Sequence, residues 1–284
     1  MTSREAYARR EDGTYDPQCI TKLLRNYRSH SAILQLPNDM FYDGELVAVA
    51  DPVRTDNMLR GHWEHLKNPT FPIMFHGVVG KDEREESSPS WFNTDEANEV
   101  LGYVQHLVRD RPYVQQRDIG VITPYAKQAA KLRLLLRANL LQEVMVGSTE
   151  LFQGQEKRVI IISCVRSTKE WLPSDARHNL GFLANPKRFN VAITRAIALL
   201  IVVGNPYVLR EDHHWGALLR YAIDNSAYVG EQLPPGDFAG GGADAATVSE
   251  LEEALENMRM QQAAVPDVND EFEFEGPAWS NMED

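Results

Sequence analysis

Two short segments place an arginine where it could bind a phosphate group. In RFNVAITRA (188–196), Arg195 shortly precedes the apolar run ALLIVVGNP (198–206). In NYRSH (26–30), Arg28 follows Tyr27, whose ring could stack on a base. A guanidinium group stays charged at physiological pH and makes paired hydrogen bonds to phosphate oxygens. Taken alone, Arg195 is better explained as a surface cation at a helix C-terminus, where the helix dipole favours positive charge.

Two further segments carry polar groups between apolar stretches. In GSTELFQGQE (147–156), Gly154 permits close approach of a ligand to the backbone, and Glu156 could accept hydrogen bonds from a ribose. In ITPYAKQ (122–128), Thr123 stands where a strand gives way to a helix, and free amides at a helix N-terminus bind phosphate. Taken alone, the first segment is better explained as an ordinary loop. The second is equally well explained as a strand–turn–helix corner.

Strands and helices are predicted to alternate along the chain. Continuous apolar, β-branched runs suit parallel strands that are covered on both faces. The predicted strands are 71–80, 118–124, 157–167 and 198–206, and the predicted helices are 33–41, 93–110, 125–140, 186–195 and 214–225. This order predicts an α/β fold with a mostly parallel, doubly wound sheet and helices on both faces. Because such sheets bind ligands beyond the carboxyl ends of their strands, we expect the polar clusters at that edge.

Some local features refine this prediction. Pro37 falls near the middle of the first helix, which it either occupies or breaks. Asn93 and Glu96 have the spacing of a capping box at the start of the second helix. KDEREESSPS (81–90) is rich in charged and turn-forming residues, so we expect a surface loop there.

The charge of the chain is concentrated at one end. Residues 231–284 contain fourteen acidic side chains and one basic one, Arg259, which gives this segment a net charge of −13. Because the whole chain has a net charge of −12, residues 1–230 carry +1. A nearly neutral domain can still present a local basic stripe to nucleic acid. We therefore expect an N-terminal linker at 1–20, a folded domain at 21–230 and a largely disordered acidic tail at 231–284, with a short helix near 248–260.

Composition argues against several other classes of protein. No apolar run approaches the roughly 20 residues needed to cross a bilayer, so we expect no membrane insertion. The first residues (MTSREAYARREDG) are charged and have no apolar centre, so we expect no signal peptide there. Cys19 and Cys164 are far apart, which argues against a disulfide framework or a cysteine metal site and favours a cytoplasmic location.

The sequence also lacks the motifs that would hold a nucleotide unaided. It contains no GxxxxGK[ST] phosphate loop, and the Gly80–Lys81 pair is followed by Asp82. DEAN (95–98) has the letters of a magnesium-binding DExx box, but it follows SPSWFNT instead of ending an apolar strand. Acidic residues favour the first turn of a helix, which explains this segment better. We therefore predict no metal site in this chain.

Eight segments in order resemble one family. They are LLRNYRSH, FPIMFHGV, SPSWFN, DIGVITPYAKQ, VGSTELFQGQE, VIIISCVRS, LGFLANPKRFNVAITRA and LLIVVGNP. Together they make residues 21–230 similar to the second RecA-like domain of Upf-one-like superfamily 1B helicases. The likeness is greatest to the Armitage-type RNA helicases, the group of the Moloney-leukaemia-virus-ten protein and its germline paralogue.

The resemblance implies a role for each polar segment. Arg28 and Arg195 match the arginines of motifs IV and VI, which touch the γ-phosphate of ATP. Tyr27 is implied near the adenine and Glu156 at the ribose, while Gln153 and Gly154 belong to the loop that couples nucleotide to nucleic acid. The implied contacts to the RNA strand are Thr123, Pro124, Tyr125, Ser148 and Thr149. Ala126 and Ile197 depart from the basic residues that relatives often carry there.

By the same resemblance, we expect half of an ATP-dependent, 5′-to-3′ RNA helicase. Its partners would be single-stranded RNA and a first RecA-like domain that supplies the phosphate loop and the Mg²⁺ ligands. This chain alone would not hydrolyse ATP. A role in RNA silencing or piRNA processing, in the cytoplasm or in ribonucleoprotein granules, is implied in turn.

Two alternatives stay open. The chain could be a non-catalytic interaction module, since EFEFEGPAW (271–279) mixes acidic and aromatic residues as do segments that fold on a protein partner. A DNA helicase of the same superfamily would have the same fold. Deleting the tail separates the first alternative from a motor, because a recruiting tail is not needed for ATP hydrolysis.

Overall fold

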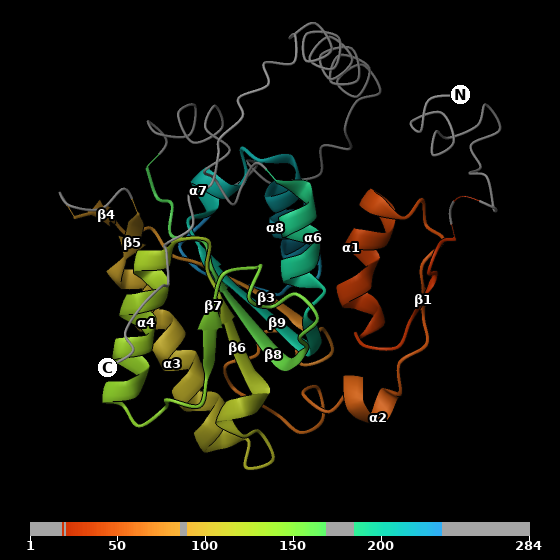
Figure 1. Cartoon of the computed structure of the whole chain (residues 1–284), viewed down its shortest axis with the longest axis horizontal. Helices are drawn as coiled ribbons and strands as arrows, with labels where there is room; N and C mark the ends of the chain where they lie inside the picture. Colours follow the sequence, from red (N-terminus) through yellow and green to blue (C-terminus); the bar gives the residue numbers. More distant parts are fainter. Residues whose placement is uncertain (1–18, 20, 86–89, 169–184, 235–284) are drawn as a thin grey trace, which may run out of the picture. The chain divides into compact units, whose positions relative to one another are not determined.

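A six-stranded sheet forms the core of the unit that ends at Gln232. The computed structural model describes residues 19, 21–85, 90–168 and 185–234. The strands lie in the order β10-β3-β9-β8-β6-β7, and every neighbouring pair is parallel. Five of them, all but β10, are labelled in Figure 1. Their bounds are β3 Ile73–Gly77, β6 Ile119–Ile122, β7 Met145–Gly147, β8 Lys157–Ser163, β9 Ala196–Gly204 and β10 Tyr228–Gly230. The predicted fold class is confirmed.

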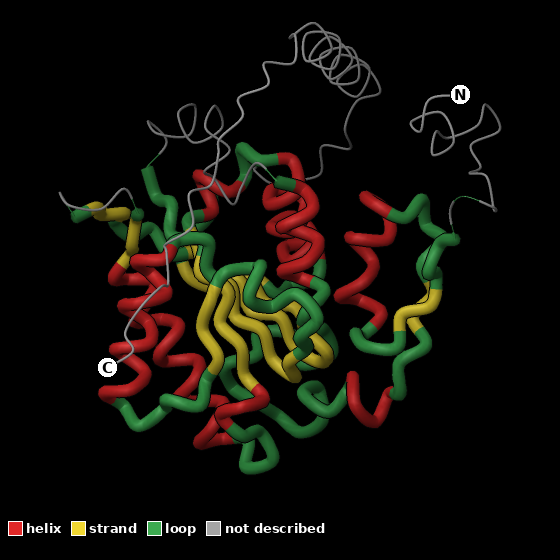
Figure 2. The backbone as a smooth tube through the Cα atoms, in the orientation of Figure 1, coloured by secondary structure: helices red, strands yellow, loops and turns green. Residues whose placement is uncertain are grey.

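Helices cover both faces of this sheet (Figure 2). On one face, α3 and α4 bury Val104 and Leu132 in a core that includes Ile161 of β8. On the other face, Phe189 of α6 packs edge-on against Trp215 of α8, with 4.9 Å between the ring centroids. The helices are α1 Ser31–Phe41, α2 Pro52–Thr55, α3 Thr94–Asp110, α4 Ala126–Ala138, α6 Pro186–Ile193, α7 Pro206–Leu209 and α8 His213–Asp224, with a 3₁₀ turn, η2, at Gln116–Asp118.

The two central strands are apolar on both faces, as the sequence predicts. Every residue of β9 is buried, and β8 is buried from Val159 onward. Alternate side chains of a strand point to opposite faces, so Ile160 and Ile161 enter different halves of the core. Burial on both sides accounts for the unbroken β-branched runs in these segments.

In the described part of 81–90, a short strand with one buried residue stands where we predicted a surface loop. Asp82–Arg84 is strand β4, which pairs antiparallel with β5, Trp91–Asn93. Asp82 is buried and forms an ion pair with the buried Arg166, which lies beyond β8. The charged composition of 81–90 concealed a buried carboxylate, because a sequence does not reveal that its partner lies 84 residues away.

Helix ends follow the local sequence closely. Asn93 caps α3 by accepting from the backbone N–H of Glu96, as its spacing predicts. Asp212 caps α8 in the same way. Pro37 lies inside an unbroken α1, so the helix accommodates it. Among the described residues, no helix is long and apolar enough to cross a membrane.

The N-terminal end of the described chain adds a small parallel pair, β1 Arg25–Asn26 with β2 Val47–Ala48. The chain divides into two units, Met1–Gln232 and Leu233–Asp284. Of the second unit only residues 233 and 234 are described. The helix predicted near 248–260 and the aromatic segment 271–279 therefore lie outside the described residues, as does most of the predicted linker.

Candidate functional site

Arg28 is positioned by a turn that the side chain of Asn26 organises. Its Oδ1 accepts from the backbone N–H groups of Arg28 and Ser29, at 2.8 and 3.0 Å. The next residue, His30, donates its backbone N–H to the carbonyl of Ile197 in β9, at 2.9 Å. These bonds tie the NYRSH segment to the amino end of the central strand.

Arg195 approaches the same place from the end of α6. Its Nε donates to the carbonyl of Val191 at 3.1 Å, and Nη1 donates to the carbonyl of Gln155 at 3.3 Å. The Arg195 carbonyl in turn accepts from the backbone N–H of Lys157, the first residue of β8, at 3.1 Å. Both of these side-chain bonds therefore go to backbone carbonyl groups, and neither goes to a carboxylate.

The electrostatics of Arg195 reveal a second cation beside it. Burial lowers the pKa of Arg195, and the neighbouring Arg28 lowers it further, against the opposing effect of Glu156. Two guanidinium groups that disfavour each other's charge create a place where an anion is favoured. Arg28 and Arg195 therefore lie close together, as contact with a single phosphate group would require.

Glu156 offsets part of this positive charge. Its Oε2 accepts from Nε of Arg28 at 2.8 Å, and its Oε1 accepts from Nη2 of Arg54 at 3.2 Å. The hydrogen bond from Arg28 is the main reason that the pKa of Glu156 is lowered. Arg28 and Glu156 keep 27% and 40% of their side-chain surface exposed, so the ion pair is open to a competing anion.

One cavity of about 400 Å³ is lined by Arg28, Glu156 and Arg195 together with their neighbours. Tyr27 lies at its rim with 64% of its surface exposed. The lining residues are Leu23, Arg25, Asn26, Tyr27, Arg28, Leu34, Tyr42, Leu46, Glu156, Thr194 and Arg195. We call this cavity the arginine pocket. It can bind an anion through the two arginines and a flat ring through Tyr27.

Our prediction that these residues lie at the carboxyl edge of the sheet is wrong. Glu156 and Arg195 directly precede the first residues of β8 and β9, so the arginine pocket lies at the amino edge of the sheet. The rule that ligands lie beyond the carboxyl ends covers open α/β sheets in general, and the arginine pocket departs from it. The sequence showed that Arg195 precedes a strand, and it is this order that places the pocket at the amino edge.

The residues that the resemblance assigns to RNA lie at the opposite, carboxyl edge. Thr123 follows β6 and Thr149 lies just beyond β7, and the Thr123 backbone N–H donates to the carbonyl of Gly147 at 3.0 Å. Both threonine hydroxyls are buried and have no partner among the described residues. Tyr125 is also buried, so only Pro124 and Ser148 of the predicted set reach the surface. The structure thus brings these residues together but does not expose the threonine hydroxyls.

The loop 148–156 connects the two edges. It leaves β7 at the carboxyl edge and enters β8 at the amino edge. Phe152 anchors it and is fully buried, whereas Gln153 is exposed and does not line the arginine pocket. Gly154 has a φ of 75°, a left-handed conformation that favours glycine.

Sequence reasoning missed Arg54 and the buried Glu96. Arg54 comes from α2, in a segment with no recognisable motif, and no signal within that segment points to Glu156. Glu96 belongs to the DEAN segment, whose interpretation as a helix start is confirmed. Its Oε2 accepts from Oγ of Ser163 at 2.7 Å and from the backbone N–H of Val165 at 2.8 Å. Burial raises the pKa of Glu96 to about 8.

Comparison with known proteins decides the family. A family model described as an AAA domain matches residues 5–207, most of the chain. The chain belongs to this family. The family is the C-terminal part of Upf-one-like superfamily 1 helicases, so the resemblance drawn from the eight segments is confirmed.

Individual relatives agree with this membership. The RNA helicase Mov10l1 of Mus musculus is 51% identical over 241 residues, which are 83% of this chain and 20% of the relative. The protein mov-10-B.1 of Danio rerio is 47% identical over 245 residues, 82% of this chain and 24% of the relative. The protein armi of Drosophila melanogaster is 39% identical over 231 residues, which are 79% of this chain and 19% of the relative. The chain therefore spans about a fifth to a quarter of these relatives.

Proposed function

We propose that this chain is the second motor domain of an ATP-dependent RNA helicase that moves 5′ to 3′. The observation that carries the proposal is the convergence of Arg28 and Arg195 on one cavity. Family membership supports it, because a second motor domain supplies arginines to a nucleotide held by the first domain. The chemistry is phosphoryl transfer from ATP to water.

The arginine pocket suits the triphosphate end of ATP. Two guanidinium groups balance the charge that develops on the transferring γ-phosphoryl group, and Tyr27 offers a ring for the adenine. Both carboxylate oxygens of Glu156 already accept hydrogen bonds from arginines, so Glu156 is not suited to act as a general base or as a magnesium ligand. Mg²⁺ and the phosphate loop thus belong to a first RecA-like domain. A ribose contact by Glu156 requires the release of one arginine.

In this proposal Arg28 exchanges partners during the cycle. In the structure it is paired with Glu156, with 2.8 Å between Nε and Oε2. When the first domain presents ATP, the γ-phosphate competes for the guanidinium with a larger negative charge than the carboxylate has. Among the described residues, the Arg195 side chain donates to the carbonyl groups of Val191 and Gln155, so phosphate can replace these bonds without breaking an ion pair.

RNA would bind at the carboxyl edge, around Pro124 and Ser148. Contacts to the strand's phosphates give binding that is largely independent of sequence. Because Thr123 and Thr149 are buried, their hydroxyls reach the strand only after the 148–156 loop shifts. Such a shift would link ATP turnover to movement on RNA, since this loop ends at Glu156. The relatives named as RNA helicases favour RNA over DNA. A role in RNA silencing or piRNA processing, in cytoplasmic ribonucleoprotein granules, extends this proposal.

The proposal is tested by Arg195→Ala in a longer protein that contains this chain and a phosphate-loop domain. RNA-stimulated ATP turnover should fall by about 10³–10⁵, the usual contribution of an arginine finger, while RNA affinity stays within about twofold. Arg137→Ala, on the exposed face of α4, is the matched control and should turn over normally. Normal turnover in Arg195→Ala rejects the assignment. Equal stimulation by single-stranded DNA rejects the choice of RNA.

A further inference from the structure

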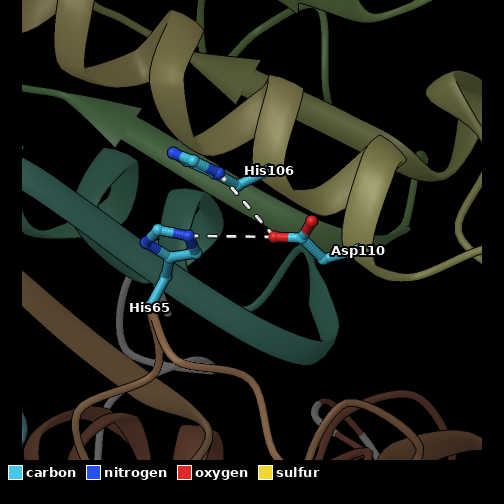
Figure 3. A group of neighbouring side chains, drawn as sticks. All are labelled: His65, His106 and Asp110. Carbon is cyan, nitrogen blue, oxygen red and sulfur yellow. Dashed lines mark ion pairs between the residues drawn. The ribbon is translucent and has the colours of Figure 1, made fainter.

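Three side chains that commonly bind metals meet beside the last turn of α3. His65 comes from the connection between α2 and β3, and His106 and Asp110 come from α3. Nε2 of His65 and Nδ1 of His106 both lie 3.7 Å from the same carboxylate oxygen, Oδ2 of Asp110. All three atoms lie within 4.8 Å of one another. Figure 3 shows the ion pairs that join both histidines to Asp110. None of the three residues lines the arginine pocket.

The local structure pre-positions these groups. His106 and Asp110 are four residues apart on one helix, so they share a face of α3. The ring of His65 packs edge-on against the buried Trp63 and stacks on that of His106, with 3.7 Å between centroids and 30° between planes. The histidines are thus adjacent, and a turn of one ring is needed for both nitrogens to face a single ion. The segment itself is fastened by Arg111, which donates to the carbonyl groups of Arg60 and Gly61 at 2.8 Å each.

We propose that His65, His106 and Asp110 form a zinc site that joins the α2–β3 connection to α3. Two imidazoles and a carboxylate suit Zn²⁺ and leave a fourth position for water, whereas Mg²⁺ prefers oxygen ligands. Zinc bonds of about 2.0–2.1 Å place tetrahedral ligand atoms about 3.3 Å apart. The two nitrogen–oxygen distances of 3.7 Å therefore need to shorten by only about 0.4 Å. This site departs from the sequence prediction of no metal.

Arg109 occupies the place that the cation would take. Its Nη2 lies 2.6 Å from Nδ1 of His106 and 3.2 Å from Oδ2 of Asp110, so it touches two of the three ligand atoms. The arginine side chain is 66% exposed and can swing into solvent. Its Nε also donates to the other carboxylate oxygen, Oδ1, at 2.6 Å, a bond that zinc binding would break. Zinc and the Arg109 guanidinium thus compete for one position.

The test is metal binding by the full 284-residue chain, with Co²⁺ as a spectroscopic substitute for Zn²⁺. We expect the visible absorption of tetrahedral Co²⁺ to saturate at one equivalent and to disappear when Zn²⁺ is added. Zn²⁺ at about 100 times its dissociation constant should raise the melting temperature by about 5–10 °C, and Mg²⁺ should not. His65→Asn and His106→Gln should lose both effects. His62→Gln, an exposed histidine in the same connection, is the matched control and should keep them.

Arg109→Gln separates a metal site from an ion-pair cluster. Removing the competing cation should tighten Co²⁺ and Zn²⁺ binding at least about fivefold, because one unit charge at 4 Å contributes about 1 kcal/mol even in water. This variant adds affinity, so it remains informative if His106→Gln fails to fold. The proposal is overturned if Co²⁺ gives no tetrahedral absorption or binds at more than one equivalent. It is also overturned if His62→Gln loses Co²⁺ absorption as His65→Asn does, or if Arg109→Gln binds Co²⁺ and Zn²⁺ more weakly.

Discussion

Glu156 connects the groups on which the arginine pocket depends. One carboxylate oxygen accepts from Arg28 and the other from Arg54. The family resemblance assigns it to the ribose, and the structure shows it paired with Arg28. In the proposed cycle, its second task is to hold Arg28 in place before ATP arrives. These two tasks predict different results with a nucleotide that lacks the 2′-hydroxyl.

We expect Glu156→Gln to lower turnover about tenfold with both ATP and 2′-deoxy-ATP, because the charge-assisted bond that positions Arg28 is lost in both cases. The measurement is kcat/KM for each nucleotide in the longer, two-domain protein. Glu150→Gln serves as control, since Glu150 pairs with Arg188 outside the pocket. If the variant loses only its preference for ATP over the deoxynucleotide, then the ribose contact is the task that matters.

Glu96 makes the stability of the domain depend on pH. Burial raises its pKa to about 8, although bonds from Ser163 and Val165 oppose the shift. The folded state therefore binds this proton more tightly than the unfolded state. The stabilisation is complete below about pH 4.5 and is lost as the pH rises towards 8, at up to about 1.4 kcal/mol per unit.

The isosteric Glu96→Gln should lack this dependence. Urea unfolding between about pH 5 and 8 should show the free energy of unfolding of the unaltered chain falling relative to that of the variant. Parallel curves would mean that the carboxyl group is already ionised in the folded state.

Single residues were predictable from the sequence where a motif surrounded them. The NYRSH and RFNVAITRA segments identified Arg28 and Arg195 because the family pattern spans both. Arg54 was not predictable, because its contact joins residues 102 positions apart and its segment has no motif. The burial of Thr123 and Thr149 was also hidden, since hydroxyl residues at strand ends are usually exposed.

At the scale of elements, the loop 148–156 is the link between the two edges of the sheet. Phe152 packs over β6 at Gly120, where a Cβ atom would lie 2.6 Å from the Phe152 ring. A glycine is needed there because the ring of the crossing loop takes the space that a side chain would use. The same loop carries Gly154 and ends at Glu156, so its position affects the arginine pocket.

Gly120→Ala should therefore destabilise the domain by about 1–3 kcal/mol, the usual cost of overpacking a core. It should also uncouple the edges, so that RNA stimulates ATP turnover less. Gly102→Ala in α3 is the matched control: nothing lies within 4 Å of its Cβ, and alanine favours the helix. Denaturant midpoints for both variants decide the question, and an unchanged midpoint for Gly120→Ala would contradict the packing argument.

Elements with strong periodicity were predictable, and short ones were not. The long helix α3 and the central strands β8 and β9 lie where their apolar patterns place them. The three-residue strands β4, β7 and β10 carry too few residues for a pattern to show. Their positions depend on contacts with distant segments, such as the pairing of β10 with β3.

For the whole molecule, charge separates the sheet domain from the acidic end of the chain. The unit that contains the sheet ends at Gln232. Residues 231–284 carry −13, and Glu231 contributes one of those charges, so 233–284 carries −12 and its removal brings the net charge from −12 to 0. Removing so much negative charge should favour approach of RNA.

Deleting 233–284 should leave ATP turnover of the two-domain protein within about twofold. It should strengthen RNA binding at low salt and have less effect at high salt, since salt screens the charge. Fluorescence anisotropy with labelled RNA at two salt concentrations measures this. A deletion that abolishes turnover would instead make the acidic segment part of the motor.

The central claim is that Arg28 and Arg195 bind one γ-phosphate. The most direct measurement is a structure of the two-domain protein with ADP and aluminium fluoride, a mimic of the transferring phosphoryl group. We predict both guanidinium groups at hydrogen-bond distance, about 2.7–3.1 Å, from the fluoride ligands, with Arg28 released from Glu156. A complex in which Arg28 stays on Glu156 and Arg195 stays on the Gln155 carbonyl would contradict the account.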